Sequence, residues 1–461
     1  MKKLIKNGVI VTATDTYEAS ILIEEGIIKA IGTDLSADDV DEVIDAHGGY
    51  VFPGGIDPHT HLDMPFGGTV TADDFESGTK AAAFGGTTTV LDFCLTNKGE
   101  PLQNSINVWH KKSKDKAVID YSFHLMIGEV TDEVLTELPQ IIEDEGITSF
   151  KVFMAYKNVF QADDSVLFKT LRSAKELGAL VMVHAENGDV IDFLVSEALE
   201  AGNTDPIHHA RTRPVIAEEE ATGRATQLTT LADSQLYVVH VTSSKAADKI
   251  AEARRKGANI WGETCPQYLV LDETNLEEAD FEGAKYVCSP PLREAWNQDK
   301  LWHALKSGQL QTLGSDHCSF NFKGQKDLGK DDFSKIPNGM PVIEDRFSIL
   351  FSEGVKKGRI TLNQFVDLVS TRSAKLFGMF PQKGTIAVGS DADLVIFDPN
   401  CERTLSVETH HMDVDYNPFE GMKVTGEPVS VLSRGNFVIK NKEFVGKPGN
   451  GNYLKRKKFK A

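Results

Sequence analysis

The fold is decided by the stretch SFKVFMA (149–155), which is followed by DSVLFKTLRSAKELG (164–178) and ALVMVH (179–184). The first and last segments are continuous apolar runs of strand length, and the middle segment has the spacing of an amphipathic helix. Strands that are apolar on both faces and alternate with helices are typical of parallel sheets covered by helices. The stretch therefore predicts one β–α–β unit, with a charged Lys151 inside its first strand.

The same alternation extends along the chain on both sides of this unit. Predicted strands lie at 51–57, 86–94, 119–127, 149–155, 179–184, 235–241, 259–264 and 310–315, and predicted helices at 73–85, 102–114, 131–145, 164–178, 216–233, 244–257, 297–307 and 342–357. Eight such units over about 310 residues predict an α/β fold, a closed (β/α)8 TIM barrel. The alternative is an open doubly wound sheet, but this usually has fewer strands, and no glycine-rich nucleotide loop follows the first strand.

Both ends of the chain have a different pattern, which is rich in strands. Runs of Ile and Val lie at 4–11 and 20–31, and further strand-like runs lie at 391–397 and 429–444, separated by turn residues. We expect residues 1–50 and 380–445 to form one small β-sandwich domain, and residues 51–379 to form the catalytic barrel. Residues 446–461 are a basic tail, for which we expect contact with a neighbouring subunit.

The composition argues against several classes of function. The 461 residues include 49 Lys and Arg against 68 Asp and Glu, a net charge of −19, which disfavours binding to nucleic acid or to anionic membranes. No apolar run approaches the roughly 20 residues of a membrane span, and the first residues do not resemble a signal peptide. The five cysteines are odd in number and widely spaced, as is typical of reduced thiols. We therefore expect a cytoplasmic globular protein.

Ionisable side chains gather at the carboxyl ends of the predicted barrel strands, where the active sites of such barrels lie. His59 and His61 are two residues apart on the first strand, so both imidazoles face the same side. Later strands add Lys151, His184, His240 and Asp316. Four imidazoles and a carboxylate at one barrel mouth favour a first-row divalent metal. For any one of these histidines alone, a hydrogen-bonded core residue would be the simpler interpretation.

Lys151 is the unusual member of this set because it lies in an otherwise apolar run. Burial lowers the pKa of a lysine. A neutral amine can add CO2 and become an anionic carbamate, which could bridge two divalent cations. The alternative is a lysine whose ammonium reaches a carboxylate at the rim. The neighbouring histidines favour the bridging interpretation.

This set, in this order on barrel strands, resembles the binuclear metal site of the amidohydrolase superfamily. The surrounding sequence is similar to that of the dihydropyrimidinases, and most closely to that of the bacterial D-hydantoinases. The segments that carry the resemblance are PGGIDPHTHLDMPFGG (53–68), FKVFMAYKN (150–158), VHAENGD (183–189), GETCPQYL (262–269), SPPLR (289–293), GSDHCSF (314–320) and KGTIAVGSDADLVIFDP (383–399). The likeness covers nearly the whole chain, and no ligand position departs from the pattern.

The resemblance implies hydrolysis of the cyclic amide bond of 5-substituted hydantoins and dihydropyrimidines. The products would be N-carbamoyl amino acids, and those formed from hydantoins would have the D configuration. Two divalent metals, usually zinc and otherwise manganese or cobalt, would be held by His59, His61 and Asp316 and by His184 and His240. Lys151, as N6-carboxylysine, would bridge them. A metal-bridging hydroxide would attack the carbonyl, with Asp316 as general base and then acid. The resemblance also implies a homotetramer, arranged as a dimer of dimers.

Substrate recognition is likewise implied by the resemblance. Tyr156 would donate to the developing oxyanion, and Ser289 and Asn338 would bind the imide edge of the ring, mostly through their main chain. The substituent at ring position five would face an apolar gate formed by Met64, Phe66, Phe153 and Phe160. Cys318 is set aside as a ligand because the ligand set is complete. Glu186 fits a partner of a metal ligand as well as a rim ion pair, and His317 and the pair His208–His209 receive no role.

Three rival functions stay open at this point. A dihydroorotase typically has an arginine after the second histidine to hold the carboxylate of its substrate, whereas Leu62 and Asp63 follow His61 here. An allantoinase would place a polar ureido group against the apolar gate. A non-catalytic dihydropyrimidinase-like scaffold would have lost metal ligands, whereas all six positions are retained here.

Overall fold

The computed structural model describes residues 1–459, and its central feature is a parallel sheet of eight strands that run in chain order. The strands are β8 (Gly55–Thr60), β11 (Thr87–Cys94), β12 (Asp120–Met126), β13 (Ser149–Phe153), β14 (Leu180–His184), β15 (Gln235–Val238), β16 (Asn259–Thr264) and β17 (Thr312–Leu313). The two edges of the sheet meet through a parallel bridge between Thr60, the last residue of β8, and His317, which lies in the segment that follows β17. The sheet therefore curls into a barrel, which confirms the predicted TIM-barrel class.

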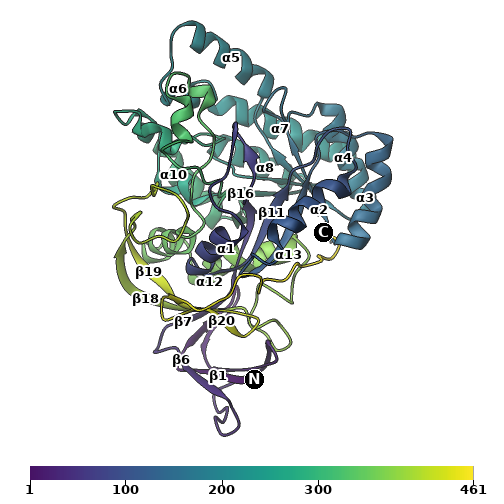
Figure 1. The fold of residues 1–461 in the computed structure, drawn as a ribbon. Helices are drawn as coiled ribbons and strands as arrows, with labels where there is room; N and C mark the ends of the chain where they lie inside the picture. Colours follow the sequence, from purple (N-terminus) through teal and green to yellow (C-terminus); the bar gives the residue numbers. More distant parts are fainter. Residues whose placement is uncertain (460–461) are drawn as a thin grey trace.

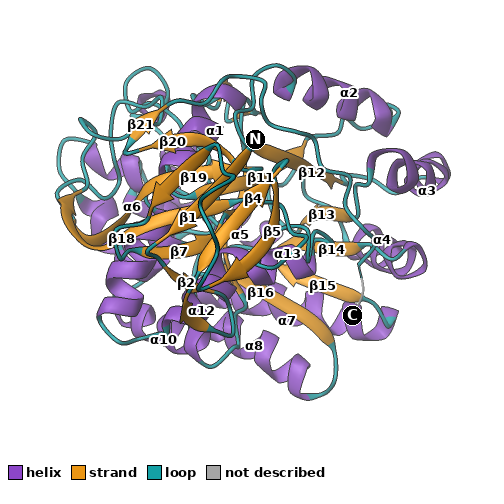
Figure 2. Ribbon diagram, turned by 90° about the horizontal axis from the view of Figure 1, so that it is seen from below, coloured by secondary structure: helices purple, strands orange, loops and turns teal. Residues whose placement is uncertain are grey.

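Helices surround these strands, as the view from below shows (Figure 2). The predicted helices are α1 (Phe75–Phe84), α2 (Leu102–Ser113), α3 (Asp132–Glu145), α4 (Asp164–Leu177), α7 (Val215–Ala232), α8 (Ser244–Arg255), α10 (Trp296–Lys306) and α11 (Arg346–Ile349), which continues as a π-helix over Leu350–Lys356. Local signals set their ends. The Asp163 side chain caps α4 by accepting from the Val166 amide at 2.8 Å, and Gly178 ends the helix with φ of 70°.

Further short elements complete the barrel. The helices α5 (Gly188–Glu200) and α6 (Ile207–Arg211) lie between β14 and α7, at the end of the barrel opposite the small domain (Figure 1), and the sequence analysis predicted neither of them. The others are α9 (Pro266–Val270), α12 (Leu362–Val366), α13 (Arg372–Leu376), a π-helix at Asp367–Thr371, 3₁₀ turns at Glu273–Glu277, Glu282–Tyr286, Lys326–Gly329 and Phe333–Lys335, and a hairpin of β9 (Pro65–Phe66) and β10 (Thr69–Val70). No described helix is both long enough and apolar enough to cross a membrane.

Two more sheets pack face to face below the barrel (Figure 1). One consists of β5 (Ile27–Gly32), β4 (Ser20–Glu24), β1 (Lys2–Lys6) and β6 (Glu42–Asp45). The other consists of β21 (Glu443–Phe444), β20 (Asn436–Lys440), β19 (Lys423–Ser433), β18 (Leu394–Thr404), β7 (Tyr50–Pro53), β2 (Val9–Val11) and β3 (Thr16–Glu18). Side chains such as Ile21 and Ile44 from the first sheet and Ile10 and Leu394 from the second form one apolar core. Both ends of the chain thus contribute to a sheet-rich unit.

The predicted strand at 51–57 is in fact two strands. Tyr50–Pro53 pairs with β18 in the small unit, whereas Gly55–Thr60 begins the barrel. The chain crosses between them at Gly54, where the nearest side-chain atom of Thr88 lies only 2.0 Å from the position that a Cβ would occupy. The sequence does not indicate this break, because both strands are buried and together form one continuous apolar run. The domain limits at residues 50 and 380 stay a prediction.

The described part of the basic tail lies on the barrel of its own chain. Asn452 accepts from the Tyr121 amide at 3.0 Å, and Leu454 donates to the Tyr121 carbonyl at 2.8 Å. Arg456 is buried and donates to the hydroxyls of Ser122 and Ser149 at 3.0 and 2.9 Å. Contact of the tail with a neighbouring subunit stays a prediction, and its residues 460–461 lie outside the described chain.

Candidate active site

All six predicted metal ligands lie at the carboxyl end of the barrel and line one pocket. His59 is on β8 and His61 follows it, Lys151 is within β13, and His184 is the last residue of β14. His240 and Asp316 lie in loops just after β15 and β17, where their φ angles of 38° and 52° turn the chain. Non-glycine residues adopt such angles only where the surrounding structure compensates for the strain. The barrel thus brings together side chains that are up to 257 positions apart.

The first group of ligands consists of His59, His61 and Asp316. Asp316 Oδ1 lies 3.1 Å from His59 Nε2 and 3.3 Å from His61 Nε2. The Nδ1 of His59 is 2.6 Å from Glu263 Oε1 and donates to it, so Nε2 keeps its lone pair. This buried lone pair has no hydrogen-bond partner and faces a carboxylate whose pKa is held low by the two imidazoles, although burial opposes this. His59 Nε2 and Asp316 Oδ1 are both electron-rich and lie 3.1 Å apart, an arrangement that suits binding of a shared cation.

The second group consists of His184 and His240. The Nε2 of His184 lies 2.8 Å from Glu186 Oε2 and donates to it, so its Nδ1 carries a lone pair. That Nδ1 is 3.0 Å from His240 Nε2, and the Nδ1 of His240 is buried with no partner. Burial and the neighbouring His184 hold the pKa of His240 well below its ordinary value, so the ring is neutral. Two imidazoles with converging nitrogens fit a second metal ion.

Lys151 lines the same pocket as the two groups and is 1% exposed. Its Nζ is 4.6 Å from the centre of the Phe93 ring and 4.9 Å from that of Phe153. Within residues 1–459 it forms no ion pair, although the charges of Asp316 and Glu263 act on it. Burial is the largest effect and lowers the pKa of Lys151 to about 8. An appreciable fraction of the amine is therefore unprotonated near neutral pH, as addition of CO2 requires.

Glu263 is a buried acid at the site for which the sequence predicts no role. It lies on β16 and accepts from His59 Nδ1, from the Tyr237 hydroxyl at 2.8 Å and from the His240 amide at 3.1 Å. Burial raises the pKa of Glu263 to about 7, and its donors oppose that rise. The available signal was an acid at the end of an apolar strand within GETCPQYL. Glu263 orients one ligand from each group.

Glu186 and His317 also support the site. Glu186 is buried and holds His184, which favours its interpretation as a ligand partner over a rim ion pair. His317 accepts the Val342 amide on Nδ1 at 3.1 Å and donates from Nε2 to Asp73 at 3.0 Å. Because His317 also pairs with Thr60 across the barrel seam, it fixes the loop that carries Asp316.

The three predicted recognition residues lie on the same pocket. Asn338 Nδ2 donates to Ser289 Oγ at 3.1 Å. The Ser289 hydroxyl and the Asn338 amide act on the Tyr156 phenol and oppose the rise in its pKa that burial causes. Lys326 is buried beside them and was not predicted as a site residue. Its Nζ donates to the carbonyls of Val287 and Gly339 at 2.8 and 2.7 Å, and thereby joins the two segments that carry Ser289 and Asn338.

The four predicted gate residues form an apolar wall of the pocket together with Met126, which was not predicted. The rings of Phe66 and Phe160 stack with centres 5.9 Å apart, and Phe153 lies 5.4 Å from Phe160. Met64 and Phe153 are buried, whereas Phe66 and Phe160 are half-buried. The two half-buried rings can therefore meet a substituent that enters the pocket. Cys318 lines the pocket but does not belong to the ligand group of His59, His61 and Asp316.

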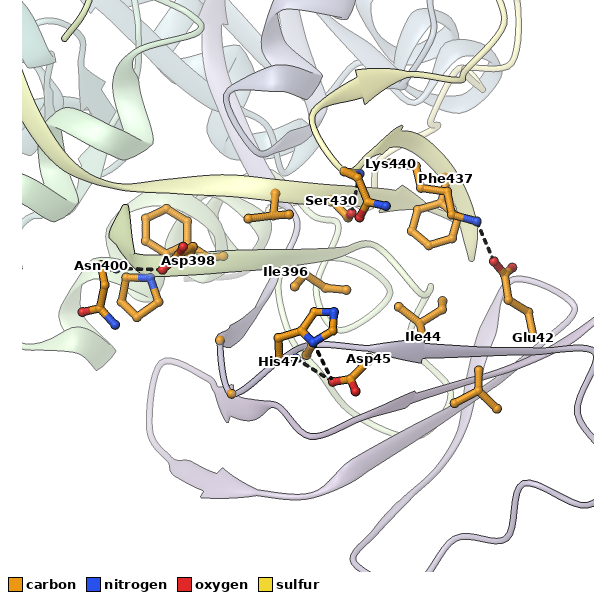
Figure 3. Close-up of a pocket in the computed structure, with 18 residues that line it drawn as sticks. Glu42, Ile44, Asp45, His47, Ile396, Asp398, Asn400, Ser430, Phe437 and Lys440 are labelled. Carbon is orange, nitrogen blue, oxygen red and sulfur yellow. Dashed lines mark hydrogen bonds and ion pairs between the residues drawn. The ribbon is translucent and has the colours of Figure 1, made fainter. Parts of the chain in front are cut away.

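A larger pocket lies between the two sheets of the small unit (Figure 3). Its charged side chains already have partners, because Lys440 Nζ is 2.9 Å from Glu42 and His47 Nδ1 is 3.6 Å from Asp45. None of the buried side-chain atoms that lack a hydrogen-bond partner belongs to this pocket within the described residues. The chemistry therefore concentrates at the barrel mouth.

Comparison with known proteins shows the family of this chain. Residues 50–438 match the amidohydrolase family. The chain is 75% identical to a D-hydantoinase of Geobacillus stearothermophilus, over 100% of this chain and 98% of that one. Among solved structures, a D-hydantoinase superposes with a TM-score of 0.99 at 74% identity, and the dihydropyrimidinase from Brevibacillus agri NCHU1002 with a TM-score of 0.99 at 69% identity. Both matches cover 100% of each chain.

Proposed function

The chain belongs to the amidohydrolase family and hydrolyses cyclic amides, and we propose that it opens 5-substituted hydantoins and dihydropyrimidines at a centre of two divalent metal ions. The observation that carries the proposal is Lys151, a buried amine that has no ion-pair partner within residues 1–459 and lines the same pocket as the converging imidazoles. The resemblance to D-hydantoinases and a dihydropyrimidinase over the full chain supports the class of substrate.

In this proposal, His59, His61 and Asp316 would hold one ion, and His184 and His240 would hold the other. Lys151, as a carbamate, would be a ligand shared by the two ions. Zinc suits imidazole and carboxylate ligands, and manganese or cobalt would also fit. Such ions supply polarisation of the amide carbonyl and a lowered pKa of water. The unpartnered buried nitrogens of His59 and His240 support this assignment.

The side chains of the protein then carry the proton and the substrate. Asp316 is ionised, because His59 and His61 hold its pKa low, so it can accept a proton from the attacking water and return it to the departing ring nitrogen. Tyr156 keeps its proton, because burial raises the pKa of its hydroxyl, so it can donate to the oxyanion that forms at the carbonyl. Ser289 and Asn338 hold the imide edge of the ring, and the gate residues Met64, Phe66, Phe153 and Phe160 receive the substituent.

We also propose that the protein is a cytoplasmic homotetramer with domain limits at residues 50 and 380. The five cysteines are free thiols, which fits a reducing compartment. Apolar side chains are exposed on neighbouring elements, with Phe193 63% and Ile216 69% exposed, and exposed apolar surface of this kind favours association. The continuous core between the two sheets of the small unit supports the domain limits.

The experiment that tests this function compares rates on dihydrouracil, hydantoin and the two enantiomers of 5-phenylhydantoin, with enzyme of known metal content. We expect turnover of the cyclic diamides, a preference for the D enantiomer, and two divalent ions per chain. Full activity in enzyme with far less than two ions per chain would contradict the metal assignment. Metal-replete enzyme that opens none of the four substrates would contradict the substrate class.

A further inference from the structure

His209, on α6, is a buried histidine for which the proposed reaction has no use. It is 1% exposed, and it lies against Cys288 and Ser289 without lining the pocket itself. Its Nε2 is 2.9 Å from the Cys288 carbonyl and 3.2 Å from the Ser289 hydroxyl. Its Nδ1 is 3.2 Å from Nη1 of Arg213. The ring therefore links an arginine to Ser289, which lines the pocket.

These contacts fix the tautomer of His209. A guanidinium can only donate, so Nδ1 must accept from Arg213 and cannot carry a proton. The proton of the neutral ring must then lie on Nε2, where it is shared between the Cys288 carbonyl and the Ser289 oxygen. Burial, followed by the charge of Arg213, holds the pKa of His209 well below its ordinary value, which keeps the ring neutral.

The tautomer of His209 in turn fixes the direction in which the Ser289 hydroxyl points its proton. A serine hydroxyl has two lone pairs and one proton. One lone pair of Ser289 Oγ accepts a hydrogen bond from Asn338 Nδ2 at 3.1 Å. The other lone pair faces Nε2–H of His209. The hydroxyl proton is therefore left to point away from both donors, toward the pocket, where the Tyr156 phenol lies.

We propose that His209 is a positioning residue, which makes Ser289 donate to the Tyr156 oxygen and thereby leaves the Tyr156 proton free for the substrate carbonyl. Arg213 then donates to His209, His209 donates to Ser289, and Ser289 donates to Tyr156, so the hydrogen bonds of the series all run toward the substrate. Without His209, the Ser289 hydroxyl could rotate and accept from Tyr156, and the phenol proton would be lost to the substrate. This inference rests on the proposed function, in which Tyr156 donates to the oxyanion.

The test compares two substitutions of His209 by steady-state kinetics with 5-phenylhydantoin. His209→Met removes the donor, and we expect kcat to fall about 10-fold with little change in KM, less than the 10²–10³-fold loss of an entire oxyanion donor. His209→Gln keeps an N–H near the Nε2 position and should restore most of kcat. His208→Gln is the matched control, because His208 lies on the same helix 6.1 Å from the Phe333 ring and has no contact with Ser289 among the described hydrogen bonds.

A purely structural role is separated by repeating the comparison in a Tyr156→Phe background. If His209 acts through the phenol, His209→Met should cause almost no further loss of kcat there. An equal loss in both backgrounds, or an unchanged kcat for His209→Met, would overturn the inference. Metal content and thermal midpoint are measured for each variant, to identify loss of folding.

Arg213 gives a second route if His209→Met does not fold. Without Arg213, only the Cys288 carbonyl still favours the proton on Nε2, so Arg213→Met should lower kcat by less than His209→Met, whereas Arg213→Lys retains a donor to Nδ1 and should preserve kcat. Equal rates for the two Arg213 variants would overturn the inference. If the metal-replete parent enzyme opens no cyclic diamide, the proposed function fails instead, so the two failures are distinguishable.

Discussion

Two buried lysines lie at opposite ends of the barrel and differ in their surroundings. Lys383, at the end near the small unit, is within 2.6 Å of Asp120 Oδ2 and of Asp393 Oδ2, and 3.0 Å from Asp391 Oδ2. These carboxylates raise its pKa against the effect of burial. Lys151, at the mouth, has aromatic rings and imidazoles around it, and burial lowers its pKa to about 8.

The difference shows that the partners of a buried lysine, and not its burial alone, distinguish a structural ion pair from a functional site. Both ends of the barrel contain three metal-ligand side chains that converge within 4.8 Å: Asp120, Asp391 and Asp393 at one end, and His59, His61 and Asp316 at the other. At the first end, the ammonium of Lys383 occupies the space that a cation would take, so the cluster is a structural ion pair. At the mouth, burial lowers the pKa of Lys151 to about 8, and one buried nitrogen each of His59 and His240 lacks a hydrogen-bond partner among residues 1–459.

The largest effect is expected for Lys151→Ala. Loss of the bridge should remove both metals and lower kcat/KM by about 10⁴-fold or more, as for groups on which a catalytic set depends. Short carboxylic acids added to the solution should restore part of the rate, because they replace the lost carbamate. Metal analysis and kinetics provide the measurement.

Lys326→Met is the matched control for this variant. Lys326 is also buried, with a pKa that burial lowers to about 7, but its Nζ binds backbone carbonyls away from the ligands. We expect Lys326→Met to retain its metals. Lys151→Ala with the metal content and rate of the parent enzyme would show that the bridging role is wrong.

Lys383→Met should instead lower stability. Removing one partner of a buried ion pair costs about 3–5 kcal/mol, because the other charges remain buried. Burial and Asp120 already raise the pKa of Asp393, and loss of Lys383 raises it further. The native state of the variant then binds protons that the unfolded chain does not, so its deficit in stability should shrink as the pH falls from 7 toward about 4. Urea unfolding at several pH values measures this. A deficit that grows on acidification would refute the ion-pair interpretation.

Glu263→Gln should weaken metal binding by about 10–100-fold, the usual effect of losing a group that orients a ligand. Glu263 accepts from three donors, and a glutamine has only one acceptor oxygen to offer them. Competition with a chelator measures the affinity. Glu344→Gln is the control, because Glu344 is also buried and 2.9 Å from a histidine, His411, but away from the pocket. Equal affinities in both variants would remove Glu263 from the site.

The smallest effect is expected for Phe160→Ala, at the gate. Phe160 is half-buried and stacks on Phe66. Removing it should change the ratio of kcat/KM for 5-phenylhydantoin to that for dihydrouracil by about 10-fold, as apolar pockets discriminate only modestly. The metal content should not change. An unaltered ratio would show that the substituent does not reach this wall.

The sequence predicted the barrel because its strands are apolar on both faces and recur in a regular alternation. The same regularity placed the six candidate ligands at strand ends, and the structure gathers them in one pocket. The break at Gly54 could not be predicted, because it depends on the Thr88 side chain packing against the crossing point. The helices α5 and α6 were missed because residues 185–215 interrupt the alternation.

The supporting residues could not be found from local sequence, because their roles depend on distant partners. Glu263 meets His59 across 204 positions, and Lys326 meets the Val287 carbonyl across 39 positions. In the sequence they resemble an ordinary acid at a strand end and an ordinary loop lysine. Only the folded chain shows that both are buried, with unusual pKa values.

The most direct test of the central contrast is ¹³C NMR of the metal-replete enzyme equilibrated with ¹³C-bicarbonate. We predict one carbamate carbon signal per chain in the parent enzyme and in Lys326→Met, and none in Lys151→Ala. Fully active enzyme without a carbamate signal, or a signal that persists in Lys151→Ala, would contradict the assignment of Lys151 as the bridge.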